Sequence, residues 1–432
     1  MDWIVKKSNN LVGDVDLPTN KSHSFRALIF AALADGISII EKPALSPDWY
    51  LGVTALKEFG AKIELISESE NRWQVKGVAG KVQTPGDIIN CGNSGILLRF
   101  LSAVAALAPN YSVLTGDHSL RFIRPMKSLI DGLSQLGATA ISTKSDDKAP
   151  VTIKGKLIGG CATIDEQDSQ PISSLLIAAQ FANEKTVINV NNPGEQPWVQ
   201  MTIDWLEKLG AKISHRNYER YEIIPIKKSW AGFEYKVPKD WSAAIYPIVA
   251  AILTENSEIT ISGIANDNTQ ADRFVLNELI SMGADISFDD DSVTARSSKL
   301  VGKKIDCNKF IDQLPILALV GACAEGKTEL TNASICRQKE CDRISASEEM
   351  LKNLGATVSQ TNDGLIIEKS KLTGSVLKSY DDHRMVMTSA VAGLIAQGQT
   401  KIIDTQCVAK TFPNFADQLR CINSNITVCS KK

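Results

Sequence analysis

The sequence lacks the marks of a secreted, membrane-embedded or nucleic-acid-binding protein. Its nine cysteines are scattered and never spaced as CxxC, so we expect free thiols in a reducing compartment rather than a disulfide scaffold. The N-terminus MDWIVKKSNN lacks the apolar stretch of a signal peptide, and no apolar run reaches about 18 residues, because Arg99 interrupts the longest candidate. A formal net charge of −2 argues against nucleic acid as a partner. We therefore expect a soluble, cytoplasmic protein.

The sequence does contain one phrase that recurs along its whole length: leucine, two residues, a large apolar residue, Gly-Ala, one residue and an apolar residue. A degenerate copy, LRCINSNI, begins at Leu419 and has Asn423 in place of the glycine. The other copies are LKEFGAKI, LSQLGATA, LEKLGAKI, LISMGADI and LKNLGATV, which begin at Leu56, Leu133, Leu206, Leu279 and Leu351. Glycine after an amphipathic helix adopts the left-handed conformation without strain, and asparagine is the next best residue. Six copies spaced roughly 70 residues apart predict six small α/β units.

With 432 residues, the chain can form two domains of about 200 residues, each with its own core. Ahead of the repeated phrase, the pattern predicts amphipathic helices over 126–136, 201–209, 272–282 and 344–354. Other helices are apolar on nearly all sides and are expected to be buried: 24–34, 96–107, 172–182, 241–253, 311–324 and 384–396. Six buried helices divide into two bundles of three. We therefore predict one domain from residues 21–240 and a second from residues 1–20 together with 241–432.

Candidate functional residues gather in the polar loops that open the apolar helices. A helix N-terminus presents unpaired N–H groups and partial positive charge, so several termini directed at one cleft would bind anions. The loops of the first domain contain Lys21, Ser22, Arg26, Asn93, Gly95, Arg99, Arg124, Asp168, Ser169 and Gln170. Those of the second contain Asp312, Arg337, Lys339, Glu340, Asp342, Arg343, Asp381, Asp382, His383, Arg384 and Lys410.

A purely structural interpretation competes at each of these loops. A run such as KECDR is common on solvated helix faces, Asn-Ser-Gly is a turn signal, and Arg26 can snorkel from a buried helix. However, Arg99, Arg343 and Arg384 adjoin strongly apolar helices, where an unpaired guanidinium would cost several kcal/mol. These arginines need an anion, either an acidic side chain or a substrate, and arginine suits bidentate capture of phosphate or carboxylate.

Five motifs, in order along essentially the whole chain, resemble those of the EPSP synthase (3-phosphoshikimate 1-carboxyvinyltransferase) family. LPTNKSHSFRALIFAALADG is similar to the family's LPGSKSxSxRALxLAALAxG, and CGNSGILLR to GNAGTxxR. RQKECDR is similar to RxKETDR, SYDDHRMVM to xYxDHRxAM, and VAKTFPNF to xxKTFPxF. The resemblance implies an α/β fold of two domains, each of three repeated units in an inside-out α/β barrel, with the active site in the interdomain cleft.

The resemblance also implies a reaction. The enolpyruvyl group of phosphoenolpyruvate would be transferred to the 5-hydroxyl of shikimate 3-phosphate, releasing phosphate and giving 5-enolpyruvylshikimate 3-phosphate in the shikimate pathway to aromatic amino acids. Such chemistry needs a general base, a general acid and a cationic clamp for phosphates and carboxylates. It needs no metal and no redox cofactor. The implied partners are the two small-molecule substrates, bound by a monomer, with no nucleic acid and no membrane.

The resemblance assigns each candidate a role. Asp312 would take the proton from the 5-hydroxyl, Glu340 would handle the proton at the vinyl carbon, and His383 would lie beside Glu340 and Arg384. Lys21 would touch both substrates, and Asp312, Glu340, Lys21 and His383 would together form the catalytic set. Shikimate 3-phosphate would contact Lys21, Ser22, Arg26, Ser169, Gln170, Asp312 and Lys339. Phosphoenolpyruvate would contact Lys21, Asn93, Gly95, Arg124, Gln170, Arg343, Arg384 and Lys410.

Several positions depart from the family pattern. Asp168 stands where the first serine of Ser-Ser-Gln is usual, and an acidic residue beside a phosphate is unfavourable. Glu195 and Trp198 fall where a phosphate-binding serine and a tyrosine are expected, and Ile335 falls where asparagine is common. The contacts to the phosphate of shikimate 3-phosphate are therefore the part of the resemblance most open to question.

Three other functions compete with this interpretation. The sister family, UDP-N-acetylglucosamine enolpyruvyl transferase, uses a cysteine in a mobile loop, and residues 112–124 contain none. An RNA-terminal phosphate cyclase should be more basic than a chain of net charge −2. A binding protein without activity is suggested by the departures at Asp168 and Glu195. It is opposed by the presence of Asp312, Glu340 and His383.

Overall fold

The computed structural model describes residues 1–264 and 269–429 and divides the chain into two compact units. The N-terminal unit comprises Thr19–Val237. The C-terminal unit is discontinuous and comprises Met1–Pro18 and Pro238–Lys432. It is discontinuous because the strands within Met1–Pro18 pair with strands that follow Pro238.

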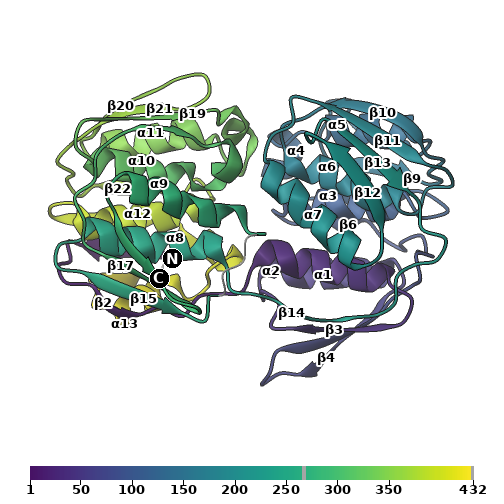
Figure 1. Ribbon diagram of the computed structural model, residues 1–432, viewed down its shortest axis with the longest axis horizontal. Coiled ribbons are helices and arrows are strands. Elements are labelled where there is room, and N and C mark those ends of the chain that lie inside the picture. Colours follow the sequence, from purple (N-terminus) through teal and green to yellow (C-terminus); the bar gives the residue numbers. More distant parts are fainter. Residues whose placement is uncertain (265–268, 430–432) are drawn as a thin grey trace. The chain divides into compact units, whose positions relative to one another are not determined.

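The N-terminal unit contains three four-stranded sheets and seven α-helices among the described residues. The first sheet has the order β14 (Glu234–Lys236), β3 (Ile37–Glu41), β5 (Arg72–Lys76), β4 (Lys62–Ser67). The second is β6 (Ile89–Asn90), β7 (Ser112–Thr115), β9 (Val151–Lys154), β8 (Thr139–Ser142), and the third β10 (Gly160–Asp165), β11 (Thr186–Asn191), β13 (Arg220–Ile224), β12 (Lys212–Arg216). The helices are α1 (Lys21–Leu33), α2 (Pro47–Glu58), α3 (Gly95–Ala105), α4 (His118–Phe122), α5 (Lys127–Gln135), α6 (Ser169–Ala179) and α7 (Gln196–Lys208). Figure 1 shows α1, in purple, lying over the first sheet, where it contacts β3 and β5.

The described part of the C-terminal unit repeats this plan. Its sheets are β16 (Asp285–Phe288), β17 (Ser292–Arg296), β15 (Glu258–Ser262), β2 (Val12–Asp14); β18 (Lys304–Asp306), β19 (Lys327–Thr331), β21 (Leu365–Glu368), β20 (Thr357–Gln360); and β22 (Val376–Lys378), β23 (Gln399–Ile403), β1 (Asp2–Lys6), β24 (Ile426–Cys429). Its α-helices are α8 (Trp241–Leu253), α9 (Val275–Ser281), α10 (Leu314–Cys323), α11 (Arg343–Asn353), α12 (His383–Ile395) and α13 (Phe415–Cys421). Short 3₁₀ helices are η1 (Ala271–Phe274), η2 (Asn308–Gln313), η3 (Ser334–Gln338) and η4 (Thr405–Lys410).

All six sheets share one pairing pattern. An edge strand runs parallel to its neighbour, and the two remaining pairs are antiparallel, as in β6 with β7, β7 with β9, and β9 with β8. In the C-terminal unit β1 and β2 come from the start of the chain: β1 lies between β23 and β24, and β2 pairs in parallel with β15. The fold class predicted from the repeated phrase, two sets of three α/β units, is confirmed.

The repeated phrase has one structural role in all six copies, which is to end a helix. The N–H after the glycine donates to the carbonyl of the leucine that opens the phrase, for example Ala211 to Leu206 at 2.9 Å and Ala138 to Leu133 at 3.0 Å. This six-to-one bond defines the Schellman motif, which requires a left-handed residue between its two ends. Gly210 has φ +89°, and Asn423, in the degenerate copy, has φ +66°. The predicted left-handed helix ends are therefore confirmed.

The apolar helices form the cores of the two units. In the C-terminal unit α8, α10 and α12 contact one another, and in the N-terminal unit α3 contacts both α1 and α6. Nearly every residue of these helices is buried. Among the described residues, no helix is long and apolar enough to cross a membrane. All nine cysteines are free.

Predicted and observed helices differ mainly at their first turns. Helix α1 begins at Lys21 and α6 at Ser169, three residues before the apolar pattern starts, because capping by Asn20 and Asp168 extends each helix into polar sequence. The predicted helix 311–324 is instead the end of the 3₁₀ helix η2 followed by α10, which begins at Leu314. Pro315 has no N–H to donate and stands in the first turn of α10, where that N–H is not needed.

We expect Gly210→Ala to lower the free energy of unfolding by about 1 kcal/mol, because an L-residue is strained in the left-handed conformation. Among the described residues, no atom lies within 4 Å of a Cβ built at this position, so the loss would come from the backbone alone. Urea unfolding should show a smaller loss for Gly210→Asn, since asparagine tolerates this conformation. Equal losses for both variants would contradict the backbone explanation.

Candidate functional site

In the N-terminal unit, most of the predicted site residues lie at the first turns of three buried helices. Lys21 and Ser22 open α1, Gly95 opens α3, and Ser169 and Gln170 open α6. Helices α3 and α6 contact each other. Helix packing, rather than sequence proximity, therefore brings Gly95 and Gln170 together.

Gly95 makes room for two guanidinium groups. A Cβ at this position would lie 2.6 Å from Arg124 Nη1, 2.8 Å from Arg99 Nη1 and 3.3 Å from Gln170 Oε1. Arg99 donates to Gln170 Oε1 at 3.0 Å and to the carbonyl of Pro125 at 3.0 Å. The structure thus brings together two arginines and the amide of Gln170 around a glycine, which is a geometry suited to a carboxylate or phosphate.

Asn93 connects Arg124 to Asp117 through hydrogen bonds of its side-chain amide. Its Oδ1 accepts from Arg124 Nη2 at 3.4 Å, and its Nδ2 donates to Asp117 Oδ2 at 2.5 Å. Asp117 is the N-cap of α4. The predicted set Asn93, Gly95, Arg124 and Gln170 therefore forms one connected cluster, and Arg99 joins it.

Arg26 has a different environment. It is 3% exposed, and its guanidinium donates to Thr202 Oγ1 from Nε at 3.0 Å, to the Trp198 carbonyl from Nη2 at 3.1 Å and to the Ser22 carbonyl from Nη1 at 3.2 Å. The guanidinium also lies over the ring of Phe100, 5.2 Å from its centroid. Burial lowers the pKa of Arg26 to about 9, because neutral acceptors replace water without adding a negative charge. Most of its hydrogen bonds hold α7 against α1.

The first turn of α6 is already occupied by acidic side chains. Asp168, its N-cap, accepts from the N–H of Gln170 at 3.0 Å and lies 3.5 Å from Arg99 Nη2. Glu195 Oε2 accepts from both the N–H and the Oγ of Ser169, each at 2.8 Å. Burial, followed by the charge of Asp168, raises the pKa of Glu166, whose carboxylate accepts from the N–H of Asp168 at 2.8 Å.

In the C-terminal unit the predicted residues form a network centred on Arg343, the first residue of α11. This side chain is 1% exposed and binds three carboxylates: Asp312 Oδ1 at 2.6 Å, Glu340 Oε2 at 2.7 Å and Asp382 Oδ2 at 2.7 Å. Burial alone would lower the pKa of Arg343, but Asp382, Glu340 and Asp312 outweigh burial and raise it well above its usual value. One guanidinium therefore sets the positions of both predicted proton-transfer residues, Asp312 and Glu340.

Arg384, in the first turn of α12, forms a second layer of this network. It donates to Asp312 Oδ2 at 2.7 Å and lies 3.9 Å from Asp272 Oδ2. Asp272 is fully buried and accepts from Gln313 Nε2 at 2.8 Å and from the hydroxyl of Ser242. Burial raises the pKa of Asp272, and the nearby Arg384 opposes that rise.

Three further predicted residues lie on the same network. Lys410, at the end of η4, contacts Glu340 Oε1 at 3.1 Å, so Glu340 is shared between Lys410 and Arg343. His383 is buried, with Nδ1 3.8 Å from Asp382 Oδ1. Lys339 is 8% exposed and lies close enough to lower the pKa of Asp312.

Asp312 is ionised and weakly basic in this arrangement. Burial would raise its pKa, but the positive charges of Arg384, Arg343 and Lys339 reverse this effect and hold the pKa far below the usual range of an aspartate. A ligand anion that drew Arg343 or Arg384 away would weaken this effect, and Asp312 would become a better base.

Sequence reasoning named Asp382 among the loop residues but gave it no role, and it missed Asp272; both are counter-charges of the network. Asp382 stands in the DDHR motif and caps α12 by accepting from the N–H of Arg384. Its position next to His383 and Arg384 in the sequence could have indicated that it belongs to the network. Asp272 is distant in sequence from both Asp312 and Arg384, and no motif links them. Only the tertiary fold reveals its contact with Arg384.

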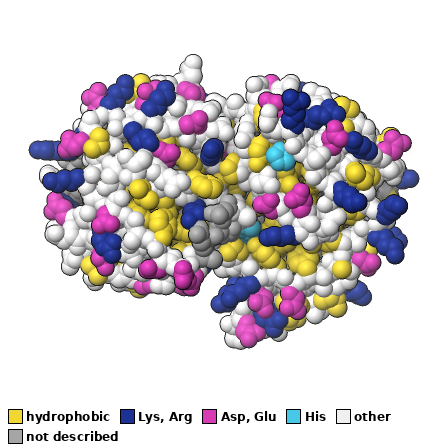
Figure 2. Space-filling model, viewed as in Figure 1, with side chains coloured by type: hydrophobic (Ala, Val, Ile, Leu, Met, Phe, Trp, Pro, Cys, Tyr) yellow, Lys and Arg dark blue, Asp and Glu magenta, His cyan; other side chains and the backbone are white. Residues whose placement is uncertain are grey.

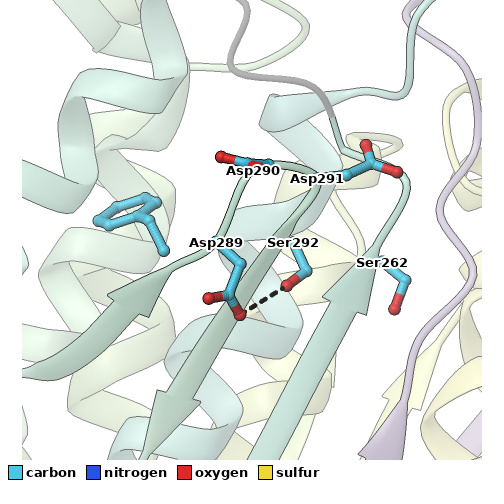
Figure 3. A pocket seen from close by; sticks show the side chains of 6 residues that line it. Ser262, Asp289, Asp290, Asp291 and Ser292 are labelled. Carbon is cyan, nitrogen blue, oxygen red and sulfur yellow. Dashed lines mark hydrogen bonds between the residues drawn. The ribbon is translucent and has the colours of Figure 1, made fainter.

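Among the described residues, no three or more His, Cys, Asp or Glu side chains lie close enough to hold a metal ion. A hollow of about 920 Å³ in the C-terminal unit is lined by Ser262, Phe288, Ser292 and three aspartates, Asp289, Asp290 and Asp291. Figure 3 shows Asp289 turned toward Ser292, to which it is hydrogen-bonded at 3.3 Å. This hollow would repel anionic substrates. On the face drawn in Figure 2, basic and acidic side chains are interspersed over both units.

Comparison with known proteins identifies relatives along nearly the whole chain. A model of the family described as EPSP synthase (3-phosphoshikimate 1-carboxyvinyltransferase) matches residues 5–419. The chain is 39% identical to a 3-phosphoshikimate 1-carboxyvinyltransferase of Acetivibrio thermocellus, over 96% of this chain and 97% of that one. It is 40% identical to one of Methanocaldococcus jannaschii, over 98% and 99%. A solved EPSP synthase from Acinetobacter baumannii superposes with a TM-score of 0.82 at 26% identity, over 99% of this chain and all of that one.

We expect Arg343→Met to destabilise the C-terminal unit by about 3–5 kcal/mol, because it leaves the buried Asp382 and the partly buried Asp312 and Glu340 without their shared cation. Denaturant unfolding would measure the loss. Arg296→Met is a suitable control in the same unit, since Arg296 pairs with Glu258 at an exposed site. Equal losses in both variants would show that the network adds no particular stability.

The depressed pKa of Asp312 predicts a pH-dependent contribution to stability. A carboxyl whose pKa is lower in the folded state stabilises the fold above its unfolded pKa of about 3.9, and this stabilisation disappears as the pH falls through the folded value. The stability advantage of the wild type over Asp312→Asn should therefore be greatest near neutral pH and shrink below about pH 4. A pH series of urea unfolding curves would test this, and an advantage that grew on acidification would contradict it.

Proposed function

The chain belongs to the EPSP synthase family, and we propose that the Arg343 network of its C-terminal unit performs the proton transfers while the Gly95 cluster of its N-terminal unit holds substrate anions. The enzyme transfers the enolpyruvyl group of phosphoenolpyruvate to the 5-hydroxyl of shikimate 3-phosphate and releases phosphate, as a step of the shikimate pathway. Which residues perform each step is the content of the proposal.

The reaction has two proton-transfer stages. The 5-hydroxyl loses its proton as its oxygen attacks the central carbon of phosphoenolpyruvate, while the methylene carbon gains a proton. The methyl group so formed then loses a proton as phosphate leaves. One group must accept the hydroxyl proton, and another must donate and later remove the proton at carbon.

We assign the first role to Asp312. In the structure its two oxygens are bound by Arg343 and Arg384, which suppress its basicity. The carboxylate of phosphoenolpyruvate, bound by the same two arginines, would compete with Asp312 for their charge. Substrate binding would thus raise the proton affinity of Asp312 at the moment when a base is needed.

We assign the second role to Glu340, which lies between Lys410 and Arg343. Its two oxygens contact different cations, so its proton affinity depends on how strongly each cation is drawn to substrate. Lys410 and Arg343 would bind phosphoenolpyruvate, and Lys339 would contact shikimate 3-phosphate. His383 would orient this side of the network through Asp382.

In the N-terminal unit, we propose that Asn93, Gly95, Arg124 and Gln170 bind phosphoenolpyruvate. The close approach of two arginines to Gly95 supports this assignment. Lys21, Ser22, Arg26, Ser169 and Gln170 would bind shikimate 3-phosphate, and Lys21 would contact both substrates. Most N–H groups of Arg26 already donate to oxygens of Ser22, Trp198 and Thr202. We therefore propose that Arg26 acts mainly by holding α7 beside the bound substrate.

The observation that carries the proposal is the double contact of Arg343 with Asp312 and Glu340. The two carboxylates to which we assign the proton transfers are bound by the two terminal nitrogens of one guanidinium, Nη1 and Nη2. The substrates are small molecules. That the enzyme acts as a monomer in the cytoplasm stays a prediction.

We expect phosphate release from shikimate 3-phosphate and phosphoenolpyruvate without added metal or nucleotide. Asp312→Ala should abolish turnover, and Glu340→Ala should reduce kcat by about 10²- to 10⁴-fold, the usual contribution of a general acid or base. Asp289→Ala, which removes the same charge from the acidic hollow of the same unit, serves as a control and should retain full activity. Full activity in a folded Asp312→Ala variant would refute its assignment as the base.

A further inference from the structure

Glu195 occupies the donors that a substrate phosphate would need at the start of α6. Its Oε2 accepts from the N–H and the Oγ of Ser169, both at 2.8 Å, and the residue is 4% exposed. The N–H of the first residue of a helix has no partner within the helix and points at the position where an anion binds. The carboxylate of Glu195 therefore stands where an external anion would stand.

The backbone of Glu195 indicates that this position is specified by the fold. Glu195 has φ +45° and ψ +36°, a left-handed conformation that is uncommon for residues other than glycine. It stands at the N-cap of α7 but makes no capping hydrogen bond there with its side chain. Instead, its carboxylate reaches across to the neighbouring helix α6.

Asp168 acts differently from Glu195. It caps its own helix through the N–H of Gln170, and Arg99 lies 3.5 Å from its other oxygen. Its charge is thus shared with a guanidinium, and neither contact uses the donors of Ser169. Of the two acidic departures from the family pattern, only Glu195 competes directly for the N–H and Oγ of Ser169.

We propose that Glu195 is a specificity-determining residue: its carboxylate fills the phosphate position at Ser169 in the free enzyme, and shikimate 3-phosphate must displace it. The inference rests on the proposed role of Ser169 in binding this substrate. A carboxylate and a phosphate repel each other at contact distance, so both cannot accept from Ser169 at once.

Displacement acts as a filter on anions. Inorganic phosphate would bind at this position only through the N–H and the Oγ of Ser169. It would gain little binding free energy there, because it would replace the Glu195 carboxylate, which already accepts from the same donors. A substrate that also binds elsewhere through its ring and carboxylate can supply the free energy for displacement. Glu195 therefore disfavours binding of inorganic phosphate, a product of the reaction, at this position.

Steady-state kinetics of three proteins would test this: the wild type, Glu195→Ser and Glu195→Gln. Glu195→Ser should lower the KM for shikimate 3-phosphate by about tenfold or more, the scale of one charge-assisted hydrogen bond. Glu195→Gln keeps an acceptor for Ser169 but removes the charge, so a smaller decrease is expected. The KM for phosphoenolpyruvate and kcat should stay within about twofold. Neither variant should add backbone strain, since both keep an L-residue at the left-handed position.

Inhibition by inorganic phosphate provides an independent measurement. In Glu195→Ser, phosphate should become a stronger inhibitor that competes with shikimate 3-phosphate. Glu207→Gln removes a charge from the exposed face of the same helix and is the matched control, with unchanged constants. Thermal unfolding would establish that each variant is folded.

The outcomes separate this inference from the proposed function. An unchanged or raised KM for shikimate 3-phosphate in both folded Glu195 variants would overturn the filter while leaving the reaction intact. A strengthened phosphate inhibition that competes only with phosphoenolpyruvate would also overturn it, because the anion would then bind elsewhere. If the wild type does not turn over the two substrates at all, the proposed function itself fails.

Discussion

The neutralisation of buried guanidinium groups by carboxylates is the interaction on which the rest of this molecule depends. Arg343 is almost completely inaccessible to water, and it is stable there only because Asp312, Glu340 and Asp382 surround it at hydrogen-bonding distance. The same ion pairs set the basicity of Asp312 and the position of Glu340. In the proposed function, stability and reactivity therefore depend on the same contacts. A change that improves one is expected to disturb the other.

The two units apply this principle with different partners. In the C-terminal unit cations outweigh burial and keep Asp312 ionised, whereas Asp272, one layer deeper, is dominated by burial. In the N-terminal unit Arg99 lies close to Asp168, whereas Arg26 is an exception, because it donates to neutral oxygens of Ser22, Trp198 and Thr202. In both units the protein's own carboxylates therefore contact arginines that could otherwise bind external anions. In the proposed function, an anionic substrate would have to compete with these carboxylates.

Much of the fold could be predicted from the sequence, because the repeated phrase encodes a local event, the Schellman end of a helix, which needs no tertiary information. The buried helices were equally visible, but their first turns were not, since capping by Asn20 and Asp168 extends them into polar sequence. The site motifs supplied Asp312, Glu340 and Arg343, whereas Asp272 could not be found because its contact to Arg384 joins distant segments. Glu195 fills the proposed phosphate position only because its side chain points toward Ser169. The spacing of residues in the sequence does not show the direction of a side chain.

The placement of β1 has a consequence for how the protein is made. This strand, Asp2–Lys6, lies between β23 and β24, both of which are synthesised after the whole N-terminal unit. Strand β1 therefore stays without its partner strands while the N-terminal unit is made and folds. The sheet that contains β1 can form only after β24 has emerged from the ribosome. A nascent chain arrested before β23 would leave Trp3 and Val5, which are buried in the finished sheet, without the strands that cover them.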